Sequence, residues 1–282
     1  MQIEFVKMEG IGNDFVMMDD MDGRIEAMGY GEVAKRLCDR RFGVGADGII
    51  VALPSESCDI GFRIINSDGS EPEMCGNGMR CFAAFVNMMG LLKKRQFTVE
   101  TKAGTIVPEI VDELNDGVVR VRVDMGEPIL TPAQIPVALE GERVVDHVVE
   151  ACGQEFAITC VSMGNPHAVI VVDELTGEEP LTYGPTLETH ALFPAKTNVE
   201  FVKIHSDREV TMHVWERGAG ETLACGTGAC ATAVACHLLG HTGRDVLIHL
   251  KGGDLELSWR EEDNHLFKTG PARVVFEGKV AI

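Results

Sequence analysis

The chain has 282 residues, 45% of them hydrophobic and 24% charged, a balance typical of a globular protein with one large domain or two of ordinary size. Its net charge of −19 argues against nucleic acid or an anionic membrane as a partner, although a small acidic ligand could still bind in a local pocket. No apolar run is long enough to span a bilayer, and the first residues begin a strand pattern and not a signal peptide.

The predicted elements alternate between short strands and a few helices. Two apolar runs predict buried helices, and each is followed by a helix-ending glycine, Gly90 or Gly240. Gly126-Glu127-Pro128 breaks the pattern near the middle, where we place the crossover between two halves. The predicted elements are an amphipathic helix at 30–38, a strand at 60–65, a buried helix at 79–92, a solvated turn at 112–117, a strand at 118–125, a short helical turn at 187–193, a strand at 210–215, a buried helix at 229–239 and a strand pair with a Gly turn at 272–280.

The cysteines indicate a reducing compartment. Their number is odd and their spacing irregular, in a chain with no export signal, which favours free thiols and a cytoplasmic location. No C-x-x-C pair occurs, so we expect no zinc or other metal site. The cysteines are Cys38, Cys58, Cys75, Cys81, Cys152, Cys160, Cys225, Cys230 and Cys236.

One short motif occurs twice, 150 residues apart, as Met74-Cys75-Gly76-Asn77-Gly78-Met79-Arg80-Cys81 and as Ala224-Cys225-Gly226-Thr227-Gly228-Ala229-Cys230. Each first cysteine comes directly before an apolar helix, beside backbone N–H groups that have no partner within the helix. This position lowers a thiol pKa and favours the reactive thiolate. Free cysteines are usually buried packing residues, but such residues do not need flanking glycines, so the matched motifs favour a functional pair of thiols.

The repeat extends beyond the cysteines. Asn66-Ser67 after the first strand corresponds to Glu216-Arg217 after the second, and Gly12-Asn13 near the start corresponds to Gly164-Asn165. A repeat of about half the chain indicates duplicated domains and not a solenoid, whose periods are about 20–50 residues. We therefore predict an α+β protein of two pseudo-symmetric domains. The first comprises 1–124 with the C-terminal strands 271–282 and carries Cys75, and the second comprises 125–270 and carries Cys225.

These motifs resemble the diaminopimelate epimerase family, cofactor-independent enzymes of lysine biosynthesis in bacteria and plants. The resemblance covers essentially the whole chain and implies two similar domains, each a strongly curved mixed β-sheet or barrel wrapped around a central helix, with the active site in the cleft between them. The motifs that carry it are Gly10-Ile11-Gly12-Asn13-Asp14-Phe15, Arg41-Phe42-Gly43-Val44-Gly45-Ala46-Asp47-Gly48, Asn66-Ser67-Asp68-Gly69-Ser70, the two cysteine motifs, Gly164-Asn165-Pro166-His167, Thr197-Asn198-Val199-Glu200 and Trp215-Glu216-Arg217-Gly218.

The resemblance implies a two-base epimerase that uses no cofactor, neither pyridoxal phosphate nor a metal. It would interconvert LL-2,6-diaminopimelate and meso-diaminopimelate, which supply lysine and cell-wall precursors. One of Cys75 and Cys225 would act as the thiolate base and the other as the proton donor on the opposite face, the assignment depending on the starting isomer. Thiols suit this role because their pKa can be tuned toward ambient pH.

The remaining site residues would bind the substrate. Backbone N–H groups at the two helix N-termini are predicted to hold the carboxylate next to the developing carbanion. Side chains at strand ends are predicted to bind the distant amino and carboxylate groups, with Arg217 gripping a carboxylate bidentately. The N–H donors are those of Gly76, Asn77, Gly226 and Thr227, and the side chains are those of Asn13, Asn66, Asn165, Asn198, Glu216 and Arg217.

Several of these residues also have a structural interpretation. An asparagine in a loop more often caps a turn than binds a ligand. His167 and Glu216 are candidates for tuning the thiol pKa, but a structural role for His167 is nearly as consistent with the pattern. Arg80 could bind an anion, although the third residue of a helix is more often solvated or ion-paired. Gly48 stands where some relatives have a larger polar residue, so it is not a predicted site residue.

Three alternatives remain. A proline racemase or hydroxyproline epimerase would share the fold and the paired cysteines, but typically has His where this chain has Asn77, and proline lacks the second charged end that Glu216 and Arg217 suit. An isomerase of the phenazine-biosynthesis type would lack the cysteine pair. A thiol redox protein would use Cys75 and Cys225 as a switch, which leaves the asparagines unexplained. The expected partner is a small-molecule substrate, and a homodimer is compatible with the sequence.

Overall fold

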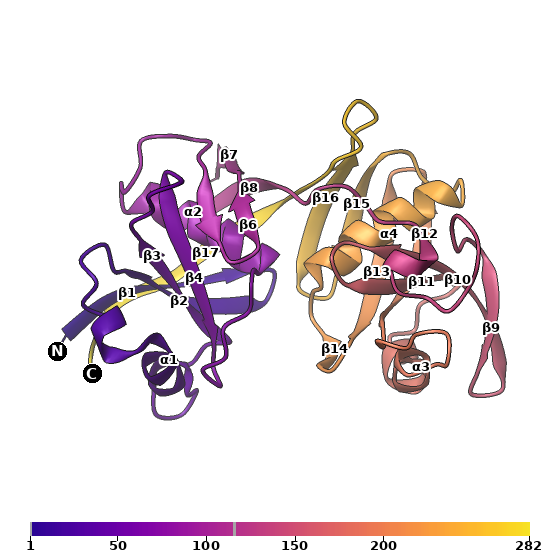
Figure 1. The fold of residues 1–282 in the computed structure, drawn as a ribbon, viewed down its shortest axis with the longest axis horizontal. Helices are drawn as coiled ribbons and strands as arrows, with labels where there is room; N and C mark the ends of the chain where they lie inside the picture. The colour runs from indigo at the N-terminus through magenta and orange to yellow at the C-terminus, as the bar shows by residue number, and fades with distance from the viewer. Residues whose placement is uncertain (1, 115–116) are drawn as a thin grey trace. The chain divides into compact units, whose positions relative to one another are not determined.

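The chain divides into two compact units, Met1–Asp124 with Thr269–Ile282, and Met125–Lys268. The computed structural model describes residues 2–114 and 117–282, and each unit is described here by itself (Figure 1). The turn predicted at 112–117 contains residues 115 and 116, which lie outside the described residues. Among the described residues, no helix is both long and apolar enough to cross a membrane.

In each unit, strands surround one apolar helix (Figure 1). The first unit contains β1 (Gln2–Gly10), β2 (Asn13–Asp19), η1 (Glu26–Met28), α1 (Tyr30–Cys38), β3 (Gly48–Leu53), β4 (Ile60–Asn66), α2 (Gly76–Met88), β5 (Val99–Thr101), β6 (Gly104–Ile106), β7 (Pro108–Glu113) and β8 (Val118–Asp124). The second contains η3 (Pro132–Gln134), β9 (His147–Ala151), β10 (Gln154–Ser162), β11 (Pro166–Val171), α3 (Glu179–Glu188), β12 (Asn198–Ser206), β13 (Glu209–Glu216), β14 (Gly220–Thr222), α4 (Gly226–Leu238), β15 (Asp245–Leu250) and β16 (Gly253–Trp259). β17 (Leu266–Ala281) begins in the second unit and ends in the first.

The two units repeat one pattern of strand pairing. β1 and β2 are antiparallel, β2 and β3 parallel, and β3 and β4 antiparallel. β10 to β13 pair in the same three ways. The registers also correspond, because Phe15 of β2 pairs with Gly48 and His167 of β11 pairs with Asn198. The predicted mixed α+β fold with an internal duplication is confirmed.

The buried helices α2 and α4 form the centre of each unit. In α2 every residue from Asn77 to Val86 is buried, and Phe82 meets Phe62 of β4 edge to face with ring centroids 5.1 Å apart. Burying one such side chain stabilises the fold by about 1.5–3 kcal/mol. Gly90 and Gly240 follow the helices with φ angles of 65° and 76°, which only glycine adopts easily, so they end the helices as predicted.

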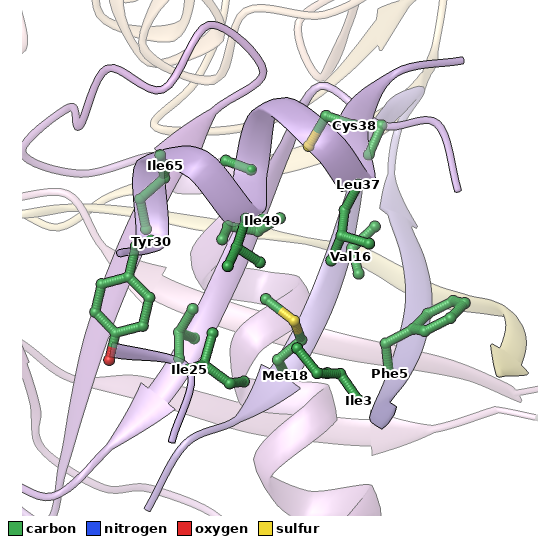
Figure 2. Packing of buried hydrophobic residues seen from close by; sticks show 14 residues of the cluster. Ile3, Phe5, Val16, Met18, Ile25, Tyr30, Leu37, Cys38, Ile49 and Ile65 are labelled. Carbon is green, nitrogen blue, oxygen red and sulfur yellow. The ribbon is translucent and has the colours of Figure 1, made fainter. Parts of the chain in front are cut away.

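A second cluster of buried hydrophobic residues lies on the other face of the first unit's sheet. α1 spans the residues predicted for it and packs its apolar face on β3 and β4. Figure 2 shows Leu37 and Cys38 of this helix beside Val16 and Ile49, within a cluster of buried hydrophobic residues. The second unit has a corresponding cluster that includes Leu187 of α3.

One helix was missed in the sequence and one strand was misjudged. The helical turn expected at 187–193 is present, since the His190 N–H donates to the Leu187 carbonyl and the Phe193 N–H to the His190 carbonyl. It follows the helix α3, which was not predicted and which tolerates Pro180 in its first turn, where no N–H donor is needed. Its Gly184 lies so close to Trp215 that a Cβ atom would come within 2.5 Å of the indole. The C-terminal strand pair is one continuous strand, β17, and Gly278 makes no turn. A glycine stands there because a Cβ atom would lie 2.6 Å from the ring of Phe5.

Arg80 also departs from expectation, because its side chain is fully buried and not solvated. Its Nε donates to the Pro271 carbonyl at 3.1 Å and its NH1 group to Asn77 Oδ1 at 3.0 Å. The residue therefore joins the first turn of α2 to β17 inside the first unit.

Replacing Arg80 with Met should lower the free energy of unfolding by about 1–3 kcal/mol, because it leaves buried acceptors without their donor. Urea unfolding measures the change. The matched control is Arg41→Met at an exposed arginine, which should shift stability by less than about 0.5 kcal/mol. Equal effects of the two substitutions would contradict the structural role of Arg80.

Candidate active site

Cys75 occupies the N-cap position of α2. Its backbone is extended, with φ −140° and ψ 119°, and its Sγ accepts the N–H of Gly78 at 3.4 Å. Ser, Thr, Asp and Asn usually fill this role, because their oxygen accepts from one of the unpaired N–H groups of the first turn. Here a sulfur does so, and the half-buried thiol is held at the positive end of the helix dipole.

Asn13 lies beside Cys75 with a fixed amide orientation. The hairpin between β1 and β2 turns through Ile11 and Gly12, both with positive φ, and brings Asn13 to the start of β2. Its Nδ2 donates to Asp47 Oδ2 at 2.6 Å. Its Oδ1 therefore faces the thiol of Cys75, 3.6 Å from Sγ. The structure thus brings these two predicted site residues together, with Asp47 as a support that the sequence analysis did not single out.

Asn66 ends β4, and its Nδ2 donates to Ser70 Oγ at 3.0 Å. It pairs across the ladder with Gly48. A Cβ atom on Gly48 would lie 2.6 Å from the Ile65 carbonyl oxygen, so the backbone of β4 leaves room only for glycine. The absence of a polar side chain at this position therefore follows from local packing.

Gly76 and Asn77 form the first turn of α2, where backbone N–H groups lack acceptors within the helix. The Asn77 side chain is buried and its Oδ1 accepts from Arg80, while its backbone N–H lies in the first turn of the helix. Gly226 and Thr227 occupy the same two positions in α4. Each helix can therefore offer two N–H donors to an anion.

Cys225 is the N-cap of α4, and its Sγ accepts the N–H of Gly228 at 3.3 Å. Unlike Cys75 it is buried, with 4% of its surface exposed. The expectation of a lowered thiol pKa is wrong here: burial raises the pKa of Cys225 well above its ordinary value, and the nearby carboxyl group of Glu216 raises it further. Desolvation and negative charge outweigh the helix terminus, so the structure favours a protonated Cys225.

Polar residues extend from Cys225 into the core of the second unit. Thr227 Oγ1 lies 3.6 Å from Cys225 Sγ and accepts from Asn165 Nδ2 at 3.3 Å. Asn165 Oδ1 lies 3.1 Å from His167 Nε2, and His167 Nδ1 lies 2.6 Å from Glu200 Oε1. Asn165 and His167 are thus brought to Cys225 as a connected group.

Asn198 and Arg217 meet at the end of β13. The buried Asn198 side chain donates to the Pro166 carbonyl at 2.7 Å and accepts the Arg217 backbone N–H at 2.9 Å. It therefore shapes the turn that presents Arg217, whose guanidinium donates to the Ala195 carbonyl at 3.1 Å. Glu216 accepts from the Thr222 hydroxyl at 2.5 Å.

The structure therefore assembles two half-sites, one in each unit. The first contains Cys75, Asn13 and Asn66, and the second contains Cys225 with the remaining predicted side chains. Glu200 was quoted in a motif but not predicted as a site residue. The signal was an acidic residue within a strand of apolar neighbours, since an isolated Glu is almost never fully buried unless it is paired.

Solved structures with this fold cover nearly the whole chain. A methylitaconate-delta-isomerase matches with a TM-score of 0.70 and 15% identity over 99% of this chain and 95% of that one. A probable proline racemase from Agrobacterium radiobacter K84 matches with a TM-score of 0.67 and 16% identity, covering 99% and 93%. A PhzF-family phenazine biosynthesis protein from Bacillus anthracis has a TM-score of 0.68 and 17% identity, covering all of both chains. These matches show that the chain has the same fold as these proteins.

The chain belongs to the diaminopimelate epimerase family. The family's sequence model, described as Diaminopimelate epimerase, matches residues 5–131 and 159–275. The diaminopimelate epimerase of Desulforapulum autotrophicum is 56% identical over 283 residues, all of both chains. That of Desulfitobacterium hafniense is 53% identical over 98% of this chain and 97% of its own length, and that of Methanococcus maripaludis strain C6 is 49% identical over 99% and 100%.

The raised pKa of Cys225 predicts slow alkylation at neutral pH that accelerates as pH rises. Glu216→Gln removes a negative charge near the sulfur, so it should lower the pKa of Cys225 and speed its modification by iodoacetamide at a given pH. Peptide mass mapping over a pH series measures this. Glu221→Gln, in the neighbouring β14, is the control and should leave the rate unchanged; an equal acceleration in both variants would contradict the assignment to Glu216.

Proposed function

We propose that the protein interconverts LL-2,6-diaminopimelate and meso-diaminopimelate by proton transfer at the α-carbon. The observation that carries the proposal is the pair of cysteine N-caps, Cys75 and Cys225, at equivalent places in two units with the same strand pairing. The full-length similarity to proteins named diaminopimelate epimerase supports the choice of substrate. Each unit is then an epimerase-like domain that supplies one thiol.

The chemistry needs a base and an acid on opposite faces of one carbon. A thiolate removes the α-proton and becomes a thiol, while the second thiol delivers its own proton to the other face and becomes a thiolate. Both sulfurs must reach the same carbon, so one substrate molecule must engage both half-sites. In the resting protein Cys225 is the proton donor, because burial disfavours its thiolate. For the opposite direction the two roles exchange.

The carboxylate next to the reacting carbon needs fixed positive dipoles while negative charge develops on it. The N–H groups of Gly76 and Asn77, and those of Gly226 and Thr227, meet this requirement at the starts of α2 and α4. Fixed donors of this kind cost no reorganisation during the reaction. No cofactor is needed in this scheme.

The distant amino and carboxylate groups of the substrate bind the polar strand ends in this proposal. Arg217 grips the carboxylate, and Glu216 accepts from the ammonium group. Four asparagine side chains provide further polar contacts to the substrate, those of Asn13, Asn66, Asn165 and Asn198. His167 acts through Asn165 on the environment of the thiol, as the contacts at 3.1 Å and 3.3 Å support.

We also propose a cytoplasmic enzyme of lysine biosynthesis. Cys75 and Cys225 are both free thiols, which suits a reducing compartment and a mechanism that needs two thiols. A homodimer belongs to the same proposal and is testable by sedimentation.

Cys75→Ala and Cys225→Ala should each lower epimerisation by about 10²- to 10⁴-fold or more, because each removes one partner of the proton transfer. The assay follows deuterium uptake at the α-carbon in heavy water, with both diaminopimelate isomers and with proline as the discriminating substrate. Cys81→Ala and Cys230→Ala, on the same helices, are controls that should remain active. Turnover of proline alone would favour the proline racemase alternative, and normal turnover in either catalytic variant would exclude the two-thiol mechanism.

Arg217→Lys should raise the KM for diaminopimelate by about tenfold or more, because a point charge replaces a planar fork that binds a carboxylate with two hydrogen bonds. Initial-rate kinetics measure the change. Arg208→Lys, at an exposed arginine before β13, is the control. An unchanged KM would assign Arg217 a structural role through its bond to the Ala195 carbonyl.

A further inference from the structure

Behind Cys225 lies a buried acid that the proposed mechanism does not use. The side chain of Glu200 on β12 is fully buried, and its Oε1 faces His167 Nδ1 at 2.6 Å. Among the described residues, its Oε2 has no hydrogen-bond partner. The same Oε1 would lie 2.7 Å from a Cβ atom on Gly228, so the carboxyl group packs directly under the first turn of α4.

The hydrogen bonds around His167 define where its proton lies. Asn165 Nδ2 donates to Thr227 Oγ1, so the amide oxygen Oδ1 faces His167 Nε2. An amide oxygen can only accept, so Nε2 carries a hydrogen. His167 Nδ1 then either accepts a hydrogen from a neutral Glu200 or donates one to an ionised Glu200.

The surroundings of Glu200 favour the neutral acid. An ionised carboxylate with one oxygen left unsatisfied in the core is costly, and a second carboxyl group, Glu216, is close enough to disfavour the charge. Burial raises the pKa of Glu200, and the attraction of His167 opposes this only in part. A protonated Glu200 donating to Nδ1 leaves no buried charge in the pair.

The first unit has apolar residues at the equivalent positions. A Cβ atom on Gly78 would meet Ile50 Cδ1 at 2.7 Å, the distance at which one on Gly228 would meet Glu200. The strand register likewise places Phe15 where the second unit has His167. The polar pair is therefore a property of the second half-site and not of the fold.

We propose that Glu200 is a positioning residue that acts as a neutral carboxylic acid and holds His167 as its Nε2–H tautomer. That tautomer fixes the amide of Asn165, which leaves the Thr227 hydroxyl free to donate toward Cys225. Each donor in this series of hydrogen bonds, from Glu200 to Thr227, then points toward the sulfur of Cys225. When Cys225 gives up its proton, the hydroxyl stabilises the thiolate left behind, and a neutral Glu200 does not repel it. This catalytic consequence rests on the proposed function.

The tautomer is measured directly by ¹⁵N NMR of the substrate-free protein labelled at histidine, with the His167 signals assigned from their loss in His167→Asn. We expect a protonated Nε2 and an unprotonated Nδ1 in the wild type. Glu200→Gln should keep this pattern, because its amide N–H₂ also donates to Nδ1. Glu200→Ile, which copies the residue of the first unit, should lose the fixed tautomer. Two protonated nitrogens, or a protonated Nδ1 alone, would overturn the proposal.

Kinetics of the same variants separate positioning from packing. Glu200→Gln should retain kcat within about threefold, whereas Glu200→Ile should lower kcat by about 10- to 100-fold with little change in KM. Loss of activity in both variants would mean that the ionised carboxylate is needed, and full activity in Glu200→Ile would reduce the role to packing; either result refutes the proposal. Urea unfolding identifies a variant that fails to fold. If Glu200→Ile does not fold, the kcat of Glu200→Gln still tests the proposal. Absence of epimerisation in the wild type would refute the proposed function alone, because the NMR result does not depend on substrate.

Discussion

Both half-sites depend on the hydrogen bond from a backbone N–H to a cysteine sulfur at the start of a helix. Gly78 donates to Cys75 at 3.4 Å and Gly228 to Cys225 at 3.3 Å. Glycine suits the donor position, because a Cβ atom there would lie 2.7 Å from the side chain of Ile50 in the first unit or of Glu200 in the second. One interaction therefore sets the position of the sulfur, the start of the helix and its distance from the sheet, while the N–H groups of the two preceding residues remain available to an anion.

The same backbone gives the two thiols different environments. Cys75 is half-buried beside an amide oxygen, whereas Cys225 is buried near the carboxyl group of Glu216, and both burial and that group raise its pKa. A helix N-terminus favours a thiolate only while water or fixed dipoles also solvate the sulfur, and burial removes the water. Two equivalent backbone positions therefore differ in environment, and the buried one favours a protonated thiol, which suits a reaction that needs a proton donor.

The sequence predicted what short-range patterns determine. The extent of α1, the glycines that end α2 and α4, and the internal duplication all follow from periodicity and from φ angles that favour glycine. The errors concern long-range packing. The helix α3 was missed because it contains prolines. The glycine within β17 is explained by the nearby ring of Phe5. The buried Arg80 could not be distinguished from a surface arginine without knowing that β17 lies against α2. The pKa of Cys225 likewise depends on how deeply the folded chain buries its thiol, which the local sequence does not show.

The buried pair of Glu200 and His167 differs from the rest of the core, because the first unit has apolar residues in the equivalent places. Burying a Glu–His pair removes two polar groups from water, and apolar residues of similar volume usually stabilise a core at least as well. Ile50 and Phe15 fill the equivalent places in the first unit with no change in strand register. The duplicated fold therefore forms without Glu200 and His167. Because the pair also connects through two hydrogen bonds to the residue beside Cys225, its presence in one unit only is explained by the chemistry of that thiol and not by the stability of the sheet.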